Sequence, residues 1–444
     1  MIRPYAARRE VRLPWCDPLE VLGAIGSQDG ALGLFSAAGG RVLIATGPDA
    51  VWQGEGDAAA ALIDDPAWGE GGVQLLSYDG GARVATGLRE QVWPDLMAAR
   101  YPAWLVFETG ARTLTAVGRG ADDAAVEQAL EQAAGWTRMT PQRRDITGPL
   151  SVSFEADCNE AAYRTAVADV VARIAAGDLF QANIARAWSG ELKPEADPLD
   201  VFLRLVDASP APYAAFWRQG ERVLVSNSPE LFLTFEPGGR VETRPIKGTR
   251  PRHADPTADQ AEADTLRQSP KDLAENLMIV DLMRNDLSRV CAPSSVRVES
   301  LFALESYANV HHLASTVTGQ LRPGRSVADL MAATFPPGSI TGAPKHQAMK
   351  VIAGHEPPRG PWCGSLVLRD AVGNLTASVL IRSLAFEHRD GRWHWRTQAG
   401  AGIVADSDPV SEAAEVLSKI SAIRQALTGV QGASTTFSTV RGRR

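Results

Sequence analysis

The chain has 444 residues, a formal net charge of −7 and 45% hydrophobic residues, enough apolar material for a sizeable core and too much for a disordered or collagen-like chain. A mildly acidic chain without a basic stripe lacks the charge pattern of a nucleic-acid binder. No window approaches the roughly 18 consecutive apolar residues that a membrane span needs. We therefore expect a soluble cytoplasmic protein that binds neither nucleic acid nor a membrane, with its four cysteines reduced and buried.

Short apolar runs separated by Asp-Gly and Gly-Gly pairs fill residues 1–150, a pattern typical of antiparallel strands and hairpins. Residues 159–176 show helical periodicity. Strands are predicted at 222–228 and 231–236, and a further pair, 375–387 and 392–404, is joined by a tight turn. The succession of strands and helices favours a mixed α+β fold over a doubly wound parallel sheet. We divide the chain into an N-terminal half (1–150), a second region (151–427) and a tail (428–444) expected to be disordered.

Two long helices have clear N-terminal signals. Ser269 as N-cap and Pro270 at the first position predict a helix over 270–287, and Asp408 followed by Pro409 begins another. Apolar residues at helical spacing predict the buried positions of both helices: Leu273, Leu277, Val280 and Leu287 in the first, and Val410, Ala413, Leu417, Ile420 and Leu427 in the second.

Each of these helices carries an acidic pair three residues apart near its start, Asp272 with Glu275 and Glu412 with Glu415. The members of a pair share a helix face because three residues correspond to about 300° of rotation. One such pair is explained by the positive N-terminus of its helix. If the two helices converge, four carboxylates would need a cation, and hard oxygen ligands suit Mg²⁺ bridging to an anionic substrate.

Small residues close the strand 392–404, where Gly400 and Gly402 could let backbone N–H groups approach an anion, although a flexible turn would look the same. Along the preceding strand, alternation places Arg382 on the side of Leu380 and Leu384. An arginine among core-facing residues needs a carboxylate partner.

Three further positions are candidates for catalysis. Lys247 lies between an isoleucine and a glycine at the end of a strand, and if the fold encloses it, its amine would lose its proton more easily and act as a nucleophile. Glu230 would be a proton donor if apolar neighbours raise its pKa. His311 and His312 lack zinc-site spacing, and we expect one buried and one exposed.

These segments resemble the chorismate-utilising enzymes, which include anthranilate, aminodeoxychorismate, isochorismate and salicylate synthases. The resemblance covers residues 150–427 and rests on DLAENLMIVDLMRNDL, FPPGSITGAPK, the IRS strand, GAGIVADSDP and SEAAEVLSK in the family's order. It implies an α+β fold in which two interleaved αβ subdomains form an αββα sandwich of the anthranilate/aminodeoxychorismate synthase type. Chorismate and Mg²⁺ would lie at its centre.

The resemblance also implies roles for individual residues. The Mg²⁺ ligands would be Glu275 and Glu415, with Asp272 and Glu412 beside them. Lys247, Glu230 and His312 would be catalytic, with His312 near the leaving group. The chorismate cradle would comprise Gly248, Thr249, Ser339, Trp362, Arg382, Gly400, Ala401, Gly402 and Lys419.

Three positions distinguish the members of the family. Isochorismate and salicylate synthases carry a water-activating lysine where this chain has Gln181, and an amide cannot act as that base. Anthranilate synthases typically carry PIAGT where this chain has PIKGT, so Lys247 could attack ring C2, displace the C4 hydroxyl and let ammonia enter at C4. Tryptophan-regulated anthranilate synthases tend to carry a methionine where this chain has Ala214.

The resemblance therefore implies formation of 4-amino-4-deoxychorismate for 4-aminobenzoate and folate synthesis, and anthranilate formation for tryptophan synthesis is the alternative. None of the four cysteines lies in the G-x-C-x-G motif of class I glutaminases, so ammonia would come from a separate glutaminase subunit. A catalytically idle regulator that binds tryptophan or chorismate is the third candidate. The presence of Lys247, Glu230 and both acidic pairs argues against it.

Overall fold

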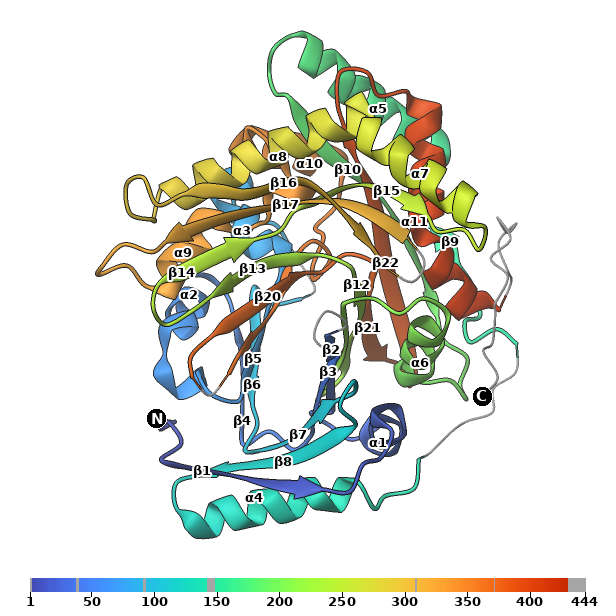
Figure 1. Ribbon diagram of the computed structural model, residues 1–444. Helices are drawn as coiled ribbons and strands as arrows, with labels where there is room; N and C mark the ends of the chain where they lie inside the picture. Colours follow the sequence, from blue (N-terminus) through green and yellow to red (C-terminus); the bar gives the residue numbers. More distant parts are fainter. Residues whose placement is uncertain are drawn as a thin grey trace.

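A computed structural model describes residues 2–36, 40–90, 93–141, 148–307, 310–370 and 372–429. The chain forms two large sheets with helices packed on their outer faces (Figure 1). Every strand pairing within the described ranges is antiparallel, so the α+β prediction is confirmed.

The larger sheet forms one side of the molecule. Its strands, in spatial order, are β1 (Ala7–Leu13), β8 (Thr113–Gly120), β7 (Ala103–Glu108), β3 (Arg41–Ala45), β2 (Leu32–Ser36), β11 (Tyr213–Gln219), β12 (Arg222–Ser228), β21 (Ser383–Arg389), β22 (Arg392–Ile403), β10 (Gln181–Glu191) and β18 (Gly342–Ala343), with β9 (Glu155–Ala156) beside β10.

The smaller sheet lies opposite. Its spatial order is β15 (Ile246–Pro251), β17 (Val310–Gln320), β14 (Arg240–Thr243), β13 (Leu231–Phe235), β20 (Leu375–Val379), β19 (Ser365–Arg369), β5 (Gly72–Leu76), β6 (Leu96–Arg100) and β4 (Ala50–Gly54), with β16 (Arg297–Ser306) beside β17.

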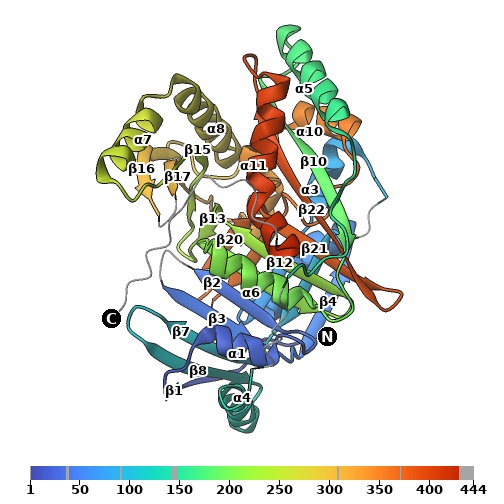
Figure 2. The ribbon, with the colours of Figure 1, turned by 90° about the vertical axis from the view of Figure 1, so that its right-hand side faces the viewer.

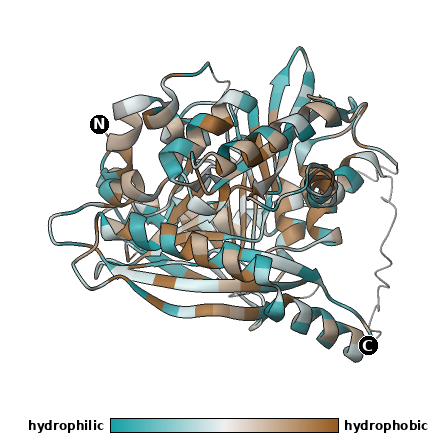
Figure 3. Ribbon diagram, turned by 90° about the horizontal axis from the view of Figure 1, so that it is seen from above, coloured by the Kyte–Doolittle hydropathy of each residue, from teal (hydrophilic) through white to brown (hydrophobic). Residues whose placement is uncertain are grey.

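Two apolar cores hold the helices to these sheets. One lies against the larger sheet and includes residues of α1 (Pro18–Ile25), α4 (Asp123–Trp136), α5 (Glu160–Ala175), α6 (Pro198–Ala208) and α11 (Pro409–Thr428). The other lies against the smaller sheet and includes residues of α2 (Gly56–Asp64), α3 (Tyr78–Thr86), α8 (Pro270–Ser288) and α9 (Val327–Thr334). Helix α10 (Lys345–His355) contributes buried residues to both cores, and α7 (Pro256–Gln268) packs beside β15 and β17. Figure 3 shows apolar and polar residues alternating along the helices.

The N-terminal half contributes strands to both sheets. Strand β2 pairs with β11 in the larger sheet, and β5 pairs with β19 in the smaller one. The two halves of the sequence are therefore interleaved, as the family resemblance implies. No helix in the described part of the chain is both long and apolar enough to span a bilayer.

The predicted run 375–387 is wrong as a single strand. It is β20 in the smaller sheet followed by β21 in the larger one, and the chain crosses between the sheets at Arg382, whose φ is +50°. Alternation along one strand therefore does not set the direction of Arg382. The remaining segments agree with the predictions: 222–228 is β12, 159–176 contains α5, and Ser269 and Asp408 cap α8 and α11.

Several predicted burial positions are also wrong. Leu277, Val410 and Leu417 are 46%, 54% and 40% exposed. The buried face of each helix differs from the one that the apolar residues predict, because it also carries polar residues. Among them are Asn276 in α8 and Glu412 in α11. Two other predictions of burial were wrong. Both His311 and His312 are buried, where one was expected to be exposed, and of the four free cysteines Cys16 and Cys158 are only partly buried. Helix α11 continues to Thr428, and the rest of the predicted disordered tail, from 430 on, lies outside the described residues.

Candidate active site

The candidate residues gather where β15 and β17 of the smaller sheet face β22 and β10 of the larger sheet, below the N-termini of α8 and α11 (Figure 2). Lys247 extends from β15 and is 13% exposed, and its Nζ lies 4.0 Å from Oε2 of Glu275 in α8. A Cβ at Gly402 of β22 would lie 3.3 Å from this Nζ and 3.0 Å from Nε2 of Gln181. Gly402 therefore lets the amine lie close to the opposite sheet.

Glu230 follows β12 and is 5% exposed. Burial raises its pKa to about 7, although the Ser339 hydroxyl donates a hydrogen bond to it and the charges of Lys247 and Lys419 oppose the rise. Because that value is close to neutral pH, the carboxyl can release a proton there. Glu230 therefore has the raised pKa that a proton donor at this position needs.

His312 of β17 is neutral at neutral pH. Burial and the nearby Arg382 lower its pKa to about 4, and its Nδ1 lies 2.9 Å from Oγ1 of Thr249. His311 points to the other side of the strand, where it contacts Ser306 and Asp259. The two histidines thus have separate environments, and only His312 is oriented toward the candidate site.

Lys271 bridges the acidic pair of α8 and the acidic pair of α11. Nζ of Lys271 lies 3.9 Å from Oε1 of Glu275 and 3.6 Å from Oε1 of Glu412. Nζ of Lys419 lies 2.6 Å from Oε1 of Glu415, and it also donates a 3.0 Å hydrogen bond to the carbonyl of Gly400 in β22. Three lysine ammonium groups, counting Lys247, therefore surround these carboxylates.

Their electrostatic settings differ. Burial raises the pKa of Glu275 despite Lys247 and Lys271. Burial also acts on Glu415, but Lys419 and Lys271 outweigh it and hold the pKa of that carboxyl below its usual value. Asp272 pairs with Arg250 at 3.2 Å and lies against Gly248, whose φ is +82°.

No group of three or more His, Cys, Asp or Glu side chains is arranged as a metal site among the described residues. Lysine ammonium groups contact the acidic pairs instead. The donor set itself, carboxylate oxygens from two facing helices, has the hard-ligand chemistry that Mg²⁺ prefers. The chemical type of these donor atoms therefore suits a magnesium ion.

The end of β22 that carries Gly400 and Gly402 faces buried polar groups that lack hydrogen-bond partners. A Cβ at Gly400 would lie 2.5 Å from Oδ1 of Asn183 and 3.2 Å from the ring of Trp362. Within the described part of the chain, Asn183 Oδ1, Trp362 Nε1 and the whole amide of Gln181 are buried without a hydrogen bond. Buried polar groups are nearly always satisfied, so a polar ligand beside Gly400 and Gly402 would complete these contacts.

Arg382 lies at the crossing between the sheets. A non-glycine residue at positive φ is strained, and such strain is typical of functional sites. Burial lowers the pKa of its guanidinium, and among the described residues no carboxylate pairs with it. The carboxylate partner predicted for it is thus not found in the described part of the chain, which leaves the group available to an anionic ligand.

Ala401 differs from its glycine neighbours, because its side chain lies on the opposite face of β22, in the apolar core. It can contribute to a cradle only through its backbone. Sequence reasoning missed Asn183 and Lys271, and it considered Gln181 only as a replaced base. No local pattern marks Asn183, which becomes visible only when β10 pairs with β22.

A shielded amine, a carboxyl with a raised pKa and an unpaired arginine together define an enzyme site for a small anionic substrate. Residues 49–425 match the family described as chorismate binding enzyme. The chain belongs to that family.

Several curated relatives are similar to this chain. It is 43% identical over 280 residues to aminodeoxychorismate synthase component 1 of Klebsiella aerogenes (62% of this chain, 60% of that protein). It is 38% identical over 358 residues to the protein of the same name from Salmonella typhimurium (80% and 76%). Anthranilate synthase component 1 of Streptomyces coelicolor is 42% identical over 283 residues (63% and 54%). The match thus spans about three fifths to three quarters of the two aminodeoxychorismate synthase relatives.

Solved structures support the fold. Anthranilate synthase component I from Streptococcus pneumoniae has a TM-score of 0.75 at 26% identity, covering 86% of this chain and 92% of that one. The menaquinone-specific isochorismate synthase of Escherichia coli also has a TM-score of 0.75, at 18% identity, covering 96% and 95%. The predicted fold type is confirmed.

Proposed function

We propose that the protein is the large subunit of an aminodeoxychorismate synthase, which converts chorismate and ammonia to 4-amino-4-deoxychorismate for 4-aminobenzoate and folate synthesis. The observation that carries the proposal is the position of Lys247. Its side chain is 13% exposed, and its amine lies against Gly402, 4.0 Å from Glu275 and close enough to Glu230 to act on its charge. Anthranilate formation, in which ammonia adds directly at C2, would need no nucleophile at this position.

In the proposed reaction, the Lys247 amine forms a bond to C2 of chorismate while the C4 hydroxyl leaves, and Glu230 donates the proton that makes the leaving group water. Ammonia then forms a bond at C4 and releases Lys247 from C2, so the lysine is regenerated and the product carries the amino group at C4. A proton must return to Glu230, and its pKa of about 7 allows this near neutral pH.

The other residues would bind and orient the substrate. The guanidinium of Arg382 would pair with a substrate carboxylate, and the backbone at Gly400, Ala401 and Gly402 would donate to the anion. Neutral His312, held by Thr249, would face the leaving hydroxyl. Glu275 and Glu415, with Asp272 and Glu412 beside them, would hold Mg²⁺, which when bound supplies charge neutralisation for a substrate carboxylate.

Ammonia would be delivered by a glutaminase subunit. The names of the similar relatives, each a component 1, support a partner. Free cysteines fit a reducing compartment, and we infer that the protein works in the cytoplasm. With purified protein, ammonium salt should support turnover while glutamine should not until a glutaminase subunit is added. Efficient use of glutamine by the chain alone would contradict the two-subunit proposal.

The decisive experiment replaces the nucleophile. Lys247→Ala should still bind chorismate but lose nearly all 4-amino-4-deoxychorismate formation, and intact-protein mass spectrometry during turnover should detect a lysine adduct in the wild type alone. The matched control is Lys350→Ala, because Lys350 is an exposed lysine on α10. Anthranilate as the wild-type product would favour the second candidate, which the similarity to anthranilate synthases keeps open.

A further inference from the structure

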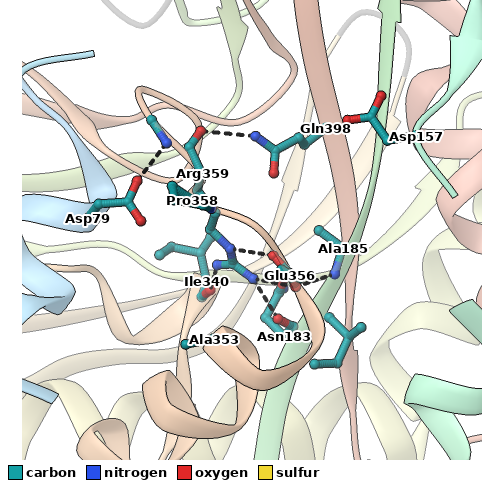
Figure 4. Close-up of polar contacts among 12 residues, drawn as sticks. Asp79, Asp157, Asn183, Ala185, Ile340, Ala353, Glu356, Pro358, Arg359 and Gln398 are labelled. Atoms are coloured by element: carbon teal, nitrogen blue, oxygen red, sulfur yellow. Dashed lines mark hydrogen bonds and ion pairs between the residues drawn. The ribbon is translucent and has the colours of Figure 1, made fainter. Parts of the chain in front are cut away.

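A buried ion pair lies directly behind the candidate cradle, in the loop between α10 and β19. Arg359 is 3% exposed, and its guanidinium carbon lies 4.5 Å from the ring centre of Tyr78 and 4.8 Å from that of Trp362. Nε and Nη2 donate to the two carboxylate oxygens of Glu356 at 2.8 and 3.0 Å. The guanidinium therefore forms a two-point ion pair with Glu356 (Figure 4) and also contacts two aromatic rings.

The same guanidinium joins segments that are far apart in the sequence. Nη2 donates a 2.7 Å hydrogen bond to the carbonyl of Asn183 in β10, and Nη1 donates a 3.1 Å bond to the carbonyl of Ile340. Glu356 completes the link by accepting a 2.7 Å bond from the backbone N–H of Ala185. Figure 4 shows these contacts converging on Arg359 and Glu356.

The segments that Arg359 joins each contribute residues that lie in or beside the candidate cradle. Asn183 and Trp362 are the two side chains against Gly400. Ile340 follows Ser339, whose hydroxyl donates to Glu230. Arg359 itself lies behind these walls, and its contacts within the described part of the chain are to protein groups.

The loop is fixed from behind as well. Gln398, two residues before Gly400 on β22, donates a 2.9 Å hydrogen bond to the carbonyl of Arg359. The N–H of Gly360 donates a 2.7 Å bond to Asp79 of α3. The position of the guanidinium is therefore set by the larger sheet and by α3.

Stability alone is a weak reason for such a pair, because taking two charges out of water costs free energy that apolar residues of similar volume would not lose. What the pair supplies is geometry. A planar guanidinium can donate in several fixed directions at once, which a lysine cannot do.

We propose that Arg359, oriented by Glu356, is a positioning residue for substrate binding: it fixes Asn183, Trp362 and the Ser339 loop relative to one another. The identity of the ligand rests on the proposed function, since chorismate is the substrate assigned there. The positioning role rests on the contacts just described.

The test compares Arg359→Lys and Glu356→Gln with a matched control, Arg218→Lys. Arg218 is likewise a buried arginine, bonded to the carbonyl of Gly26 at 2.9 Å and to Asp197 at 2.5 Å, on strand β11. Chorismate binding is measured by calorimetry with Mg²⁺ present, and thermal unfolding is measured on the same samples. We expect all three variants to unfold at lower temperature. Only the first two should bind chorismate more weakly, by about tenfold or more, as expected for losing hydrogen bonds to a charged group.

The proposal is overturned if Arg359→Lys and Glu356→Gln bind chorismate with a Kd within about twofold of that of Arg218→Lys, because such a change is far below the effect of losing one charged hydrogen bond. Arg359 would then only stabilise the core. If Arg359→Lys does not fold, Glu356→Gln decides, since it keeps the side-chain shape and one oxygen acceptor. A wild-type protein that binds no chorismate would refute the proposed function instead. The two failures are therefore distinguishable.

Discussion

Replacing Glu230 by glutamine should change how stability depends on pH. Burial raises the pKa of this carboxyl from 4.5 to about 7, so the folded chain binds the proton more tightly than the unfolded chain. The stability that this proton contributes is complete below the unfolded value and is lost as the pH rises through about 7. At about 1.4 kcal/mol for each pKa unit, the folded wild type loses about 3 kcal/mol across that range.

Glu230→Gln has no proton to lose and keeps an oxygen that can accept from Ser339. Relative to the wild type, the variant should therefore gain about 3 kcal/mol between about pH 4 and pH 8. Urea unfolding followed by circular dichroism at several pH values measures this difference. Glu131→Gln, at an exposed position on α4, is the control and should follow the wild type at every pH.

The proposed role adds a kinetic expectation to the thermodynamic one. Turnover by the wild type should fall above about pH 7, where the acid has lost its proton, and Glu230→Gln should be nearly inactive at every pH. A free-energy difference between Glu230→Gln and the wild type that does not change with pH would show that Glu230 titrates normally. Glu230 would then not be a buried general acid.

Three other expectations follow from the site. Gly402→Ala should lower turnover by about tenfold or more with a small change in thermal unfolding temperature, because its Cβ would crowd Lys247 and Gln181; wild-type kinetics would show that the close approach is unimportant. Glu275→Gln should raise the Mg²⁺ concentration needed for half-maximal activity, measured against Glu131→Gln, and an unchanged requirement would exclude Glu275 as a ligand. His312 should titrate near pH 4 by NMR and not near 6.5, and its signal should be assigned by its loss in His312→Asn; titration near 6.5 would mean that the imidazole is not shielded.

Local signals in the sequence predicted local structure well. Ser269 and Asp408 begin α8 and α11 as expected, because capping depends on residues within one turn. The run 375–387 was misassigned because its apolar residues suit either sheet, and nothing nearby indicates that the chain crosses from one to the other. Burial along the two helices was misassigned because polar residues such as Asn276 occupy positions that periodicity gives to apolar ones.

The candidate site depended on non-local information. Spacing predicted that Asp272 shares a face with Glu275, but the meeting of α8 with α11 followed only from family resemblance. The contribution of Asn183 depends on the register between β10 and β22, and that of Arg359 on a loop that contacts both of these strands and α3. Neither residue lies in a segment that suggested chemistry by its composition.

The interleaving of the two halves also governs how the chain can be made. Strand β5 near the start can pair early with β6, but its other neighbour, β19, lies near the end; β2 likewise pairs with β3 and must wait for β11. Such distant pairings close slowly and leave strand edges open during synthesis. The ribosome must therefore release most of the chain before either sheet is complete. Splitting the gene between the halves should yield fragments that aggregate separately and assemble only when produced together.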